Sequence, residues 1–446
     1  MLGHLERACG GPRQALALLA ILAIGLGLRL DYAVDPPNAP VDDARAYARI
    51  ARALHAGEGF TQGDGPGYRH LQSASNYAPG LPLLTAAIYE ARGEDDETAA
   101  RVILALLGSL AVPLAFFLGK RLGGPAAGLV ASVPTAVLPA LLEYGGMLMT
   151  EPVGAALLAA AILAWLRAGE SPRLLASAAT GLLLGGLAML RPEYLVLLLL
   201  LPALALWERR RQRPLNPRML APPALMLAAA CLVLAPWTVR NFVTFDRLVP
   251  VSTGGGQLLY EGSYMRAGPD PERFTPVFLD EHPWIGRKLG PRPGPIYRGQ
   301  AVAELAARRH PGEEPDTALR RMGLEAYGDA LGEDPLELGG FLGGKIWLAW
   351  TAPARDVMEK PFWRGFQLVL LLAALIGLAV GLARRRREAV VIATVFLAVT
   401  LMQAVFIASP RRTLLLAPEI SALAGFGLVW LVARVRGGRE SRLRHG

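Results

Sequence analysis

The chain has 446 residues, of which 53% are hydrophobic and 19% are charged, and its mean hydropathy is +0.34. Soluble domains are about 45–50% apolar and about 25% charged, so this composition excludes an ordinary cytosolic enzyme and a small disulfide-stabilised scaffold. The formal net charge of +9 would also fit a nucleic-acid partner. Most arginines, however, fall in short loops between apolar runs, and membrane topology explains that distribution better.

Cysteine and histidine offer no framework for a disulfide or a metal. The two cysteines are Cys9, near the start, and Cys231, inside an apolar run. Two such residues cannot build a disulfide framework or a zinc site. The six histidines show no spacing typical of metal ligands. We therefore expect no histidine- or cysteine-based metal site.

Ten apolar runs predict transmembrane helices, because crossing a bilayer core takes about 20 residues. The first run follows a basic start and could be a signal peptide, but no small-residue cleavage pattern precedes Asp31. We interpret it as an uncleaved span. The predicted fold is an all-α polytopic bundle. The runs cover residues 14–30, 100–118, 125–142, 152–167, 174–190, 193–207, 219–236, 364–383, 388–408 and 413–433.

The segments between the runs alternate in charge. One set is basic, as in Lys120-Arg121 and Arg384 to Arg387, and the positive-inside rule places it in the cytoplasm with both termini. The other set is longer, carries most of the acidic residues and is predicted to face outward. This outward set comprises residues 31–99, 143–151, 191–192, 237–363 and 409–412.

Two short apolar stretches, 79–89 and 341–350, are too short to span and are predicted to be interfacial helices on the outer surface. If either one crossed the membrane, the charge alternation after it would invert. Helix-like patches are also expected at 298–309 and 315–331. The predicted parts are a catalytic transmembrane module (1–236, with its first outer loop at 31–99), an extracytoplasmic segment (237–363), and C-terminal spans with a basic tail (364–446).

The first outer loop begins with a helical sequence that carries two aspartates. Asp42 or Asp43 suits a helix N-cap or first turn. Tyr47 follows Asp43 by four residues and so shares its helix face, where it can orient or flank the carboxylate. Simple capping remains the alternative interpretation.

Glu151 is the second acidic position, and it stands directly before Pro152 at the outer start of the fourth span. Proline suits the first helical turn and a carboxylate suits the positive helix end, so capping would again explain both residues. Asp43 and Glu151 nevertheless lie on the same predicted membrane face, at the hydrocarbon boundary. Two carboxylates that flank one cleft are typical of a glycosyl-transfer site.

Arginines occur on the predicted outer side, where positive charge is disfavoured. Arg191 lies in a tight outer turn, Arg240 follows the seventh span, and Arg411-Arg412 precede the last span. An anionic phosphate at the outer interface would explain them, because arginine binds phosphate through a fork of donors. Snorkelling to lipid headgroups is the alternative.

An ordered series of short motifs runs through nearly the whole chain. The motifs are D-x-x-x-Y (Asp43, Tyr47) followed by ARAL-x-x-GEGF, Y-x-PGLPLL (77–84), GKRLGG (119–124), MTEP (149–152), LRPE (190–193), PWTVRN (236–241) and SPRR-x-LLLAP (409–418). The series resembles that of the membrane glycosyltransferases with the C-type fold. The likeness is to bacterial relatives of the protein O-mannosyltransferases and of the lipid A aminoarabinose transferase, the glycosyltransferase family 39-like group.

This resemblance implies an inverting hexosyl- or pentosyltransferase with a polyprenyl-phosphate sugar donor. Asp43 matches the first-loop catalytic aspartate, the general base, and Glu151 falls at the second acidic position, which orients acceptor or sugar. Arg240 and Arg411 or Arg412 would stabilise the departing phosphate. The aminoarabinose enzymes have a lysine where this chain has Ala78, so Arg69 or an outer-turn arginine would take its place. The other expected substrate-binding residues are Asp42, Tyr47, Tyr77 and Arg191.

The expected acceptor is a glycolipid, a cell-wall glycan or a protein, and the resemblance leaves a divalent cation open. Membrane lipids are expected partners and nucleic acid is not. The expected location is the bacterial plasma membrane, with the site facing outside. A transporter or flippase of lipid-linked sugars is the alternative. It would need polar groups near the midplane or paired repeats with broken helices, whereas these carboxylates lie at span ends.

Overall fold

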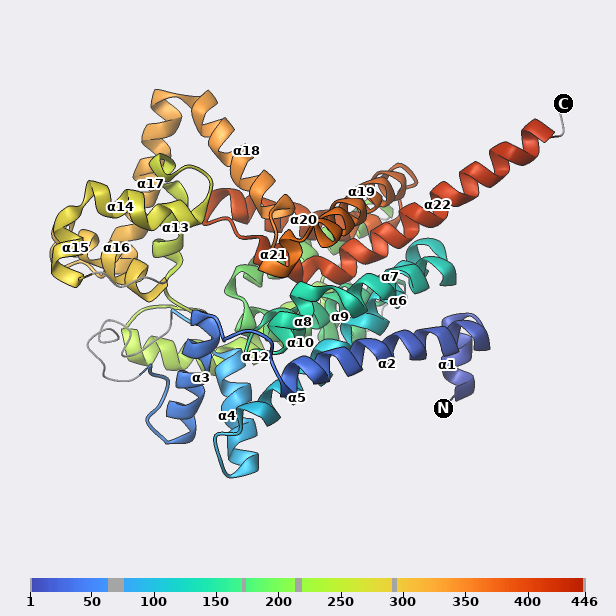
Figure 1. Cartoon of the computed structure of the whole chain (residues 1–446), viewed down its shortest axis with the longest axis horizontal. Helices are drawn as coiled ribbons and strands as arrows, with labels where there is room; N and C mark the ends of the chain where they lie inside the picture. The colour runs from blue at the N-terminus through green and yellow to red at the C-terminus, as the bar shows by residue number, and fades with distance from the viewer. Residues whose placement is uncertain (1, 63–75, 171–173, 213–218, 291–294, 444–446) are drawn as a thin grey trace.

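The computed structural model describes residues 2–62, 76–170, 174–212, 219–290 and 295–443, and every regular element in these ranges is a helix. The termini lie at one end of the molecule, and α3 (Asp42–His55), α4 (Gly80–Arg92) and a group of short helices lie at the other end (Figure 1). The predicted all-α polytopic fold is confirmed.

Seven helical segments among the described residues are long and apolar enough to cross a membrane. A bent pair, α7 (Pro125–Val137) and α8 (Pro139–Gly145), would make an eighth, with an angle of 51° at the break. The seven are α2 (Pro12–Val34), α5 with α6 (Glu97–Gly123), α9 (Glu151–Glu170), α12 (Ala221–Phe245), α19 (Pro361–Ala383), α20 (Arg387–Val405) and the segment Pro410–Arg436, which comprises α21 (Pro410–Thr413) and most of α22 (Ala417–Leu443).

Two of the ten predicted spans fall below this limit. The helix α10 (Leu174–Leu190) is apolar but has only 17 residues. The helix α11 (Leu197–Gln212) follows a 3-10 turn, η2 (Pro192–Val196), and ends in a charged sequence, so its apolar part is short. Ten spans therefore stay a prediction. The interfacial positions of α4 and α18 (Pro335–Thr351) also stay predictions, although both stretches are helical as expected.

Glycine allows the helices of the bundle to approach closely. A Cβ added at Gly377 of α19 would lie 2.0 Å from the carbonyl oxygen of Leu423 in α22, and one at Gly181 of α10 would lie 2.0 Å from that of Met226 in α12. No side chain fits at such distances. Small residues at helix interfaces are typical of membrane bundles, where packing rather than the hydrophobic effect holds helices together.

The predicted outer segment is more ordered than its irregular sequence suggests. It contains α13 (Gly255–Ser263), α14 (Phe274–Glu281), α15 (Pro283–Leu289), α16 (Pro295–Arg309) and α17 (Pro315–Glu333), and α16 and α17 confirm the two expected helical patches. These helices enclose their own aromatic core, in which the rings of Phe274 and Phe278 stack 5.2 Å apart.

The seventh predicted span ends later than expected. The sequence predicts a span that ends at residue 236, with the motif at 236–241 closing its outer end, but α12 continues through Pro236 and ends at Phe245. The reason lies in the residues after the helix: Asn241 donates hydrogen bonds to the carbonyls of Val249 and Val251, and Trp237 donates to Val251. These contacts hold the last turns of α12 in place despite the proline.

Candidate active site

Three carboxylates and three guanidiniums gather at the ends of several helices, far apart in sequence. Arg411 lies at the centre: its Nη1 donates to Asp43 Oδ2 at 2.6 Å, and its Nε donates to Glu151 Oε1. The two carboxylates that the sequence singled out therefore share one arginine. The members of this site cluster are Asp43 of α3, Glu151 of α9, Arg191 and Glu193 around η2, and Arg411 and Arg412 of α21.

The remaining ion pairs extend the site cluster to Arg412. Arg191 lies 2.6 Å from Glu151 and 3.5 Å from Glu193, and Arg412 lies 3.9 Å from Glu193. The Glu151 side chain is fully buried, so it depends on these cations, because an unpaired buried charge is costly. With all six groups ionised the cluster is neutral, and an incoming anion would compete with the carboxylates for the guanidiniums.

The local structure explains why the carboxylates are available. Val41 is the N-cap of α3, with no side-chain capping bond, and Asp43 is the second residue of the helix, in its first turn. Its other oxygen accepts a hydrogen bond from the Tyr77 hydroxyl at 3.3 Å. Glu151 is the first residue of α9, where the helix dipole also favours its negative charge.

Aromatic rings surround Asp43 and Arg411. Tyr47 and Tyr77 make an edge-to-face pair with centroids 5.3 Å apart, and the Arg411 guanidinium lies 5.7 Å from the Tyr144 ring. Tyr47 thus packs against Tyr77, the residue that donates a hydrogen bond to Asp43, and its role in orienting or flanking the carboxylate stays a prediction. Burial, and then the negative charge of Asp43, raise the pKa of both Tyr47 and Tyr77. Both phenols therefore stay protonated at neutral pH and can donate hydrogen bonds.

The electrostatic balance at Asp43 favours its ionised form. Burial acts to raise the pKa of this carboxyl. The charge and hydrogen bond of Arg411, the charge of Arg191 and the Tyr77 hydroxyl outweigh burial and hold the pKa below its ordinary value. Asp43 is therefore a carboxylate at neutral pH.

A cavity of about 360 Å³ lies beside α3. Its lining includes Ala44, which follows Asp43 in α3, and Gly146 to Leu148, which precede Glu151 in the chain. Its basic lining comprises Arg45, Arg49, Arg52 and Arg101. Arg52 pairs with Glu97, and Arg101 donates to the carbonyl of Ala33 at 2.8 Å. The cavity thus has a positive wall, and its described lining includes none of the six members of the site cluster.

Three of the expected substrate-binding residues lie elsewhere or cannot be placed. The Arg240 guanidinium lies over the Trp237 ring, 4.9 Å from its centroid, and donates to Asn241 at 3.0 Å. The rings of Phe60 and Phe245 also lie within 5.8 Å of this guanidinium. Asp42 opens α3, but its side chain is outside the part that the structure describes, as is the whole of Arg69.

The structure adds residues that the sequence analysis did not select. Glu193 joins two arginines of the cluster, and Tyr144 lies under Arg411 and donates to the carbonyl of Ala354 at 3.0 Å. Glu419 is fully buried in α22, and in the described part of the chain neither of its carboxyl oxygens has a hydrogen-bond partner. An ionisable residue inside an apolar run is itself a functional signal, and this signal could have found Glu419.

No group of three or more histidine, cysteine, aspartate or glutamate side chains that could hold a metal occurs among the described residues. At the site cluster, an arginine lies between Asp43 and Glu151.

Comparison with known proteins supports the resemblance. Residues 76–239 match the sequence model of the family described as dolichyl-phosphate-mannose-protein mannosyltransferase. No curated protein sequence matches the chain. The matched region includes Tyr77, Glu151 and Arg191, while Asp43 and Arg411 lie outside it.

Solved structures give the fold. The chain is similar to the oligosaccharyltransferase AglB from Archaeoglobus fulgidus, solved with an inhibitory peptide and a dolichol-phosphate: the TM-score is 0.55 at 13% identity, over 96% of this chain and 52% of that one. A structure of the A. fulgidus enzyme with Zn and sulfate gives a TM-score of 0.53 at 13% identity, over 93% and 49%. The chain thus spans about half the length of the archaeal enzyme.

A third structure, ArnT from Cupriavidus metallidurans bound to undecaprenyl phosphate, is 18% identical over 92% of this chain and 77% of that one, with a TM-score of 0.37. The family match and the archaeal structures together confirm the resemblance to membrane glycosyltransferases of the C-type fold that the motifs predicted.

Proposed function

We propose that this protein is an inverting glycosyltransferase that moves a sugar from a polyprenyl-phosphate donor to an acceptor hydroxyl. The observation that carries the proposal is the position of Arg411, which donates hydrogen bonds to both Asp43 and Glu151. A base, a second carboxylate and a set of guanidiniums are what transfer from a phosphate leaving group requires.

Asp43 is the general base of the proposed reaction. The acceptor oxygen bonds to the anomeric carbon on the face opposite the phosphate, and its proton passes to Asp43. The bond between the anomeric carbon and the phosphate oxygen breaks, and its electron pair stays on the polyprenyl phosphate. Asp43 is ionised at neutral pH because of Arg411, which keeps it ready to accept a proton.

The guanidiniums of the site cluster stabilise the leaving group. Arg191, Arg411 and Arg412 are paired with carboxylates. A phosphate oxygen can accept the same guanidinium hydrogen bonds as a carboxylate oxygen. The N–H groups that stabilise the negative charge developing on the phosphate are therefore already positioned. Glu151, held by two arginines, orients the sugar or the acceptor.

The proposed donor follows from the side of the membrane that the site cluster is predicted to face. The charge alternation predicts that the site cluster faces outward, and nucleotide sugars are cytosolic, so an outward site needs a lipid-carried sugar. The proposed acceptor is a glycolipid, a cell-wall glycan or a protein in a bacterial envelope.

An activity assay tests the proposal. Purified full-length protein is incubated with a radiolabelled polyprenyl-phosphate sugar and an extract of membrane acceptors. Asp43→Asn should lower the transfer rate about 10²- to 10⁴-fold, the usual contribution of a general base. The matched control is Asp95→Asn, because Asp95 contacts His55 outside the site cluster. Equal rates in the two variants would reject Asp43 as the base.

A further inference from the structure

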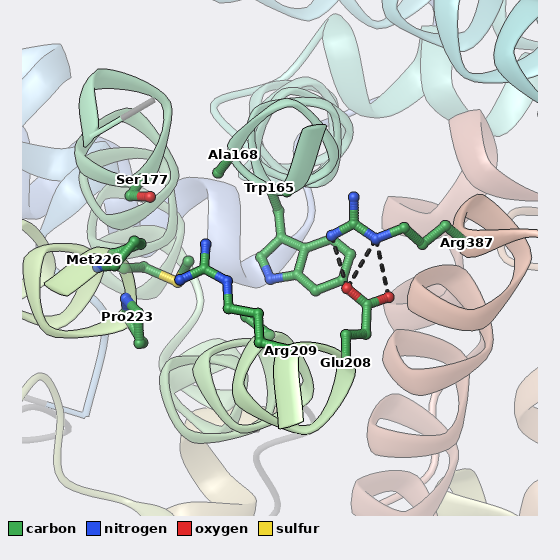
Figure 2. A pocket seen from close by; sticks show the side chains of 11 residues that line it. Trp165, Ala168, Ser177, Glu208, Arg209, Pro223, Met226 and Arg387 are labelled. Carbon is green, nitrogen blue, oxygen red and sulfur yellow. Dashed lines mark hydrogen bonds and ion pairs between the residues drawn. The ribbon is translucent and has the colours of Figure 1, made fainter. Parts of the chain in front are cut away.

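A second polar cavity lies among the helices of the bundle, and Figure 2 shows the side chains that line it. It has a volume of about 100 Å³. The ends of α9 and α11 and the starts of α10, α12 and α20 contribute its lining. The helix α9 connects the two places, since Glu151 begins it and Gly169 lies 18 residues later, about 27 Å away at 1.5 Å per residue.

Two arginines and one glutamate give this cavity a positive charge. Arg387 donates to Glu208 through Nε at 2.8 Å, and its guanidinium lies 4.7 Å from the centroid of the Trp165 ring. Arg209 donates Nη1 to the carbonyl of Met219 at 3.0 Å. Figure 2 shows the Arg209 side chain reaching between Trp165 and Met226. One carboxylate neutralises one of the two guanidiniums, so one positive charge is left.

Ser177 supplies a hydroxyl that is not used within the described part of the chain. It lines the cavity, is 1% exposed, and its Oγ has no hydrogen-bond partner among those residues. A buried hydroxyl without a partner costs about 1–3 kcal/mol. A ligand oxygen in the cavity would remove that cost.

Gly169 provides the space for the arginine. A Cβ at this position would lie 1.9 Å from Nη2 of Arg387, so any larger residue would displace the guanidinium from its place between Glu208 and Trp165. The absence of a side chain at position 169 is therefore part of how the cavity is built.

We propose that this cavity is a phosphate-binding site, separate from the reaction site. A charged fork of donors and a buried hydroxyl are the groups that bind phosphate oxygens, and the volume suits a single tetrahedral group. The rest of the lining is apolar, with Ala205, Pro222, Pro223 and Met226, which fits the glycerol and upper acyl chain of a lipid. The ligand is the phosphate head of a lipid in the leaflet opposite the reaction site, or a free phosphate.

Binding to the full-length protein in a neutral detergent tests the proposal. Native mass spectrometry measures the retention of dioleoyl phosphatidic acid, with dioleoylglycerol as the control lipid that lacks the phosphate. Arg209→Gln should weaken retention of phosphatidic acid about tenfold or more, the usual effect of losing one charge-assisted hydrogen bond. Arg167→Gln is the matched control, because Arg167 is an exposed arginine at the same end of α9.

The Ser177→Ala variant provides a second test, in which no charge is removed from the cavity. Without lipid it should leave the unfolding temperature unchanged or raise it, because it removes an unpartnered hydroxyl, while it should weaken phosphatidic acid binding several-fold. Inorganic phosphate is titrated in parallel by calorimetry. If the protein binds inorganic phosphate but does not retain phosphatidic acid, and Arg209→Gln abolishes the phosphate binding, the cavity is a site for free phosphate.

Three results would overturn the proposal. The first is that the protein binds neither phosphatidic acid nor inorganic phosphate, and the second is that Arg167→Gln and Arg209→Gln weaken binding equally. The third is that Ser177→Ala destabilises the protein and leaves the binding of phosphatidic acid unchanged. None of these results bears on Asp43, so failure here is distinguishable from failure of the glycosyltransferase proposal.

Discussion

Arg411 offers the sharpest test of how the site cluster is held together. Its removal in Arg411→Gln leaves Asp43 with the Tyr77 hydroxyl and leaves Glu151 with Arg191 and the Thr150 hydroxyl. Breaking a buried ion pair by removing one partner costs about 3–5 kcal/mol. Because Arg191 still compensates Glu151 at 2.6 Å, we expect the lower end of that range, about 3 kcal/mol.

The control is an exposed pair of similar chemistry. Arg52 and Glu97 form an ion pair with side chains 46% and 32% exposed, and such pairs contribute about 0–1 kcal/mol. Arg52→Gln should therefore lower the unfolding temperature much less than Arg411→Gln. Thermal unfolding in detergent, followed by circular dichroism, compares the two variants.

A double-mutant cycle distinguishes charge compensation from general damage. In the Arg411→Gln background, Glu151→Gln removes the carboxylate that has lost one of its two arginine partners. The double variant should therefore be more stable than the sum of the two single-variant changes in unfolding free energy predicts. If the two effects simply add, the two side chains are not coupled and the reasoning fails.

The pH dependence has a definite sign. The pKa of Asp43 is lower in the folded protein than its ordinary value of about 3.9, so its contribution to stability is present above that value and is lost as pH falls through the folded pKa. In Arg411→Gln most of this acid-sensitive contribution should be missing. If stability falls at acidic pH in Arg411→Gln as it does in the wild-type protein, Arg411 is not the group that lowers the pKa of Asp43.

Three further predictions concern the surroundings of the site cluster. Tyr77→Phe should reduce transfer several-fold and shift the acid limb of the pH–rate profile upward, because Asp43 loses a hydrogen bond that lowers its pKa; an unmoved limb would count against Tyr77 as a donor. Arg355→Gln should destabilise the protein by about 3 kcal/mol, since it strands the nearly buried Glu143 from its 2.6 Å partner; denaturation that matches wild type would show the pair to be dispensable. Glu419→Leu should leave the unfolding temperature equal or higher, because it removes buried oxygens without partners in the described structure, and a lower temperature would reveal a contact that the carboxyl needs.

The helical architecture and much of the site were readable from local patterns. Apolar runs bounded by arginines predict helices, because a bilayer imposes both the length and the position of the charges. Asp43 and Glu151 stood out as acidic residues at the predicted outer boundary of the bilayer, Asp43 in the first outer loop and Glu151 at the start of a span. The series of motifs added the family resemblance that the comparisons support.

Only the tertiary structure decided which charges meet. By sequence, Arg240 and Arg411 are equivalent, since each is an outer arginine next to a span, yet one lies on aromatic rings and the other joins two carboxylates. Arg411 is 260 residues from Glu151 and 368 from Asp43. Periodicity and hydropathy describe the chain over a few helical turns. The contacts of Arg411 depend instead on how close packing at residues such as Gly377 and Gly181 brings the helix ends together, and no local sequence pattern encodes that arrangement.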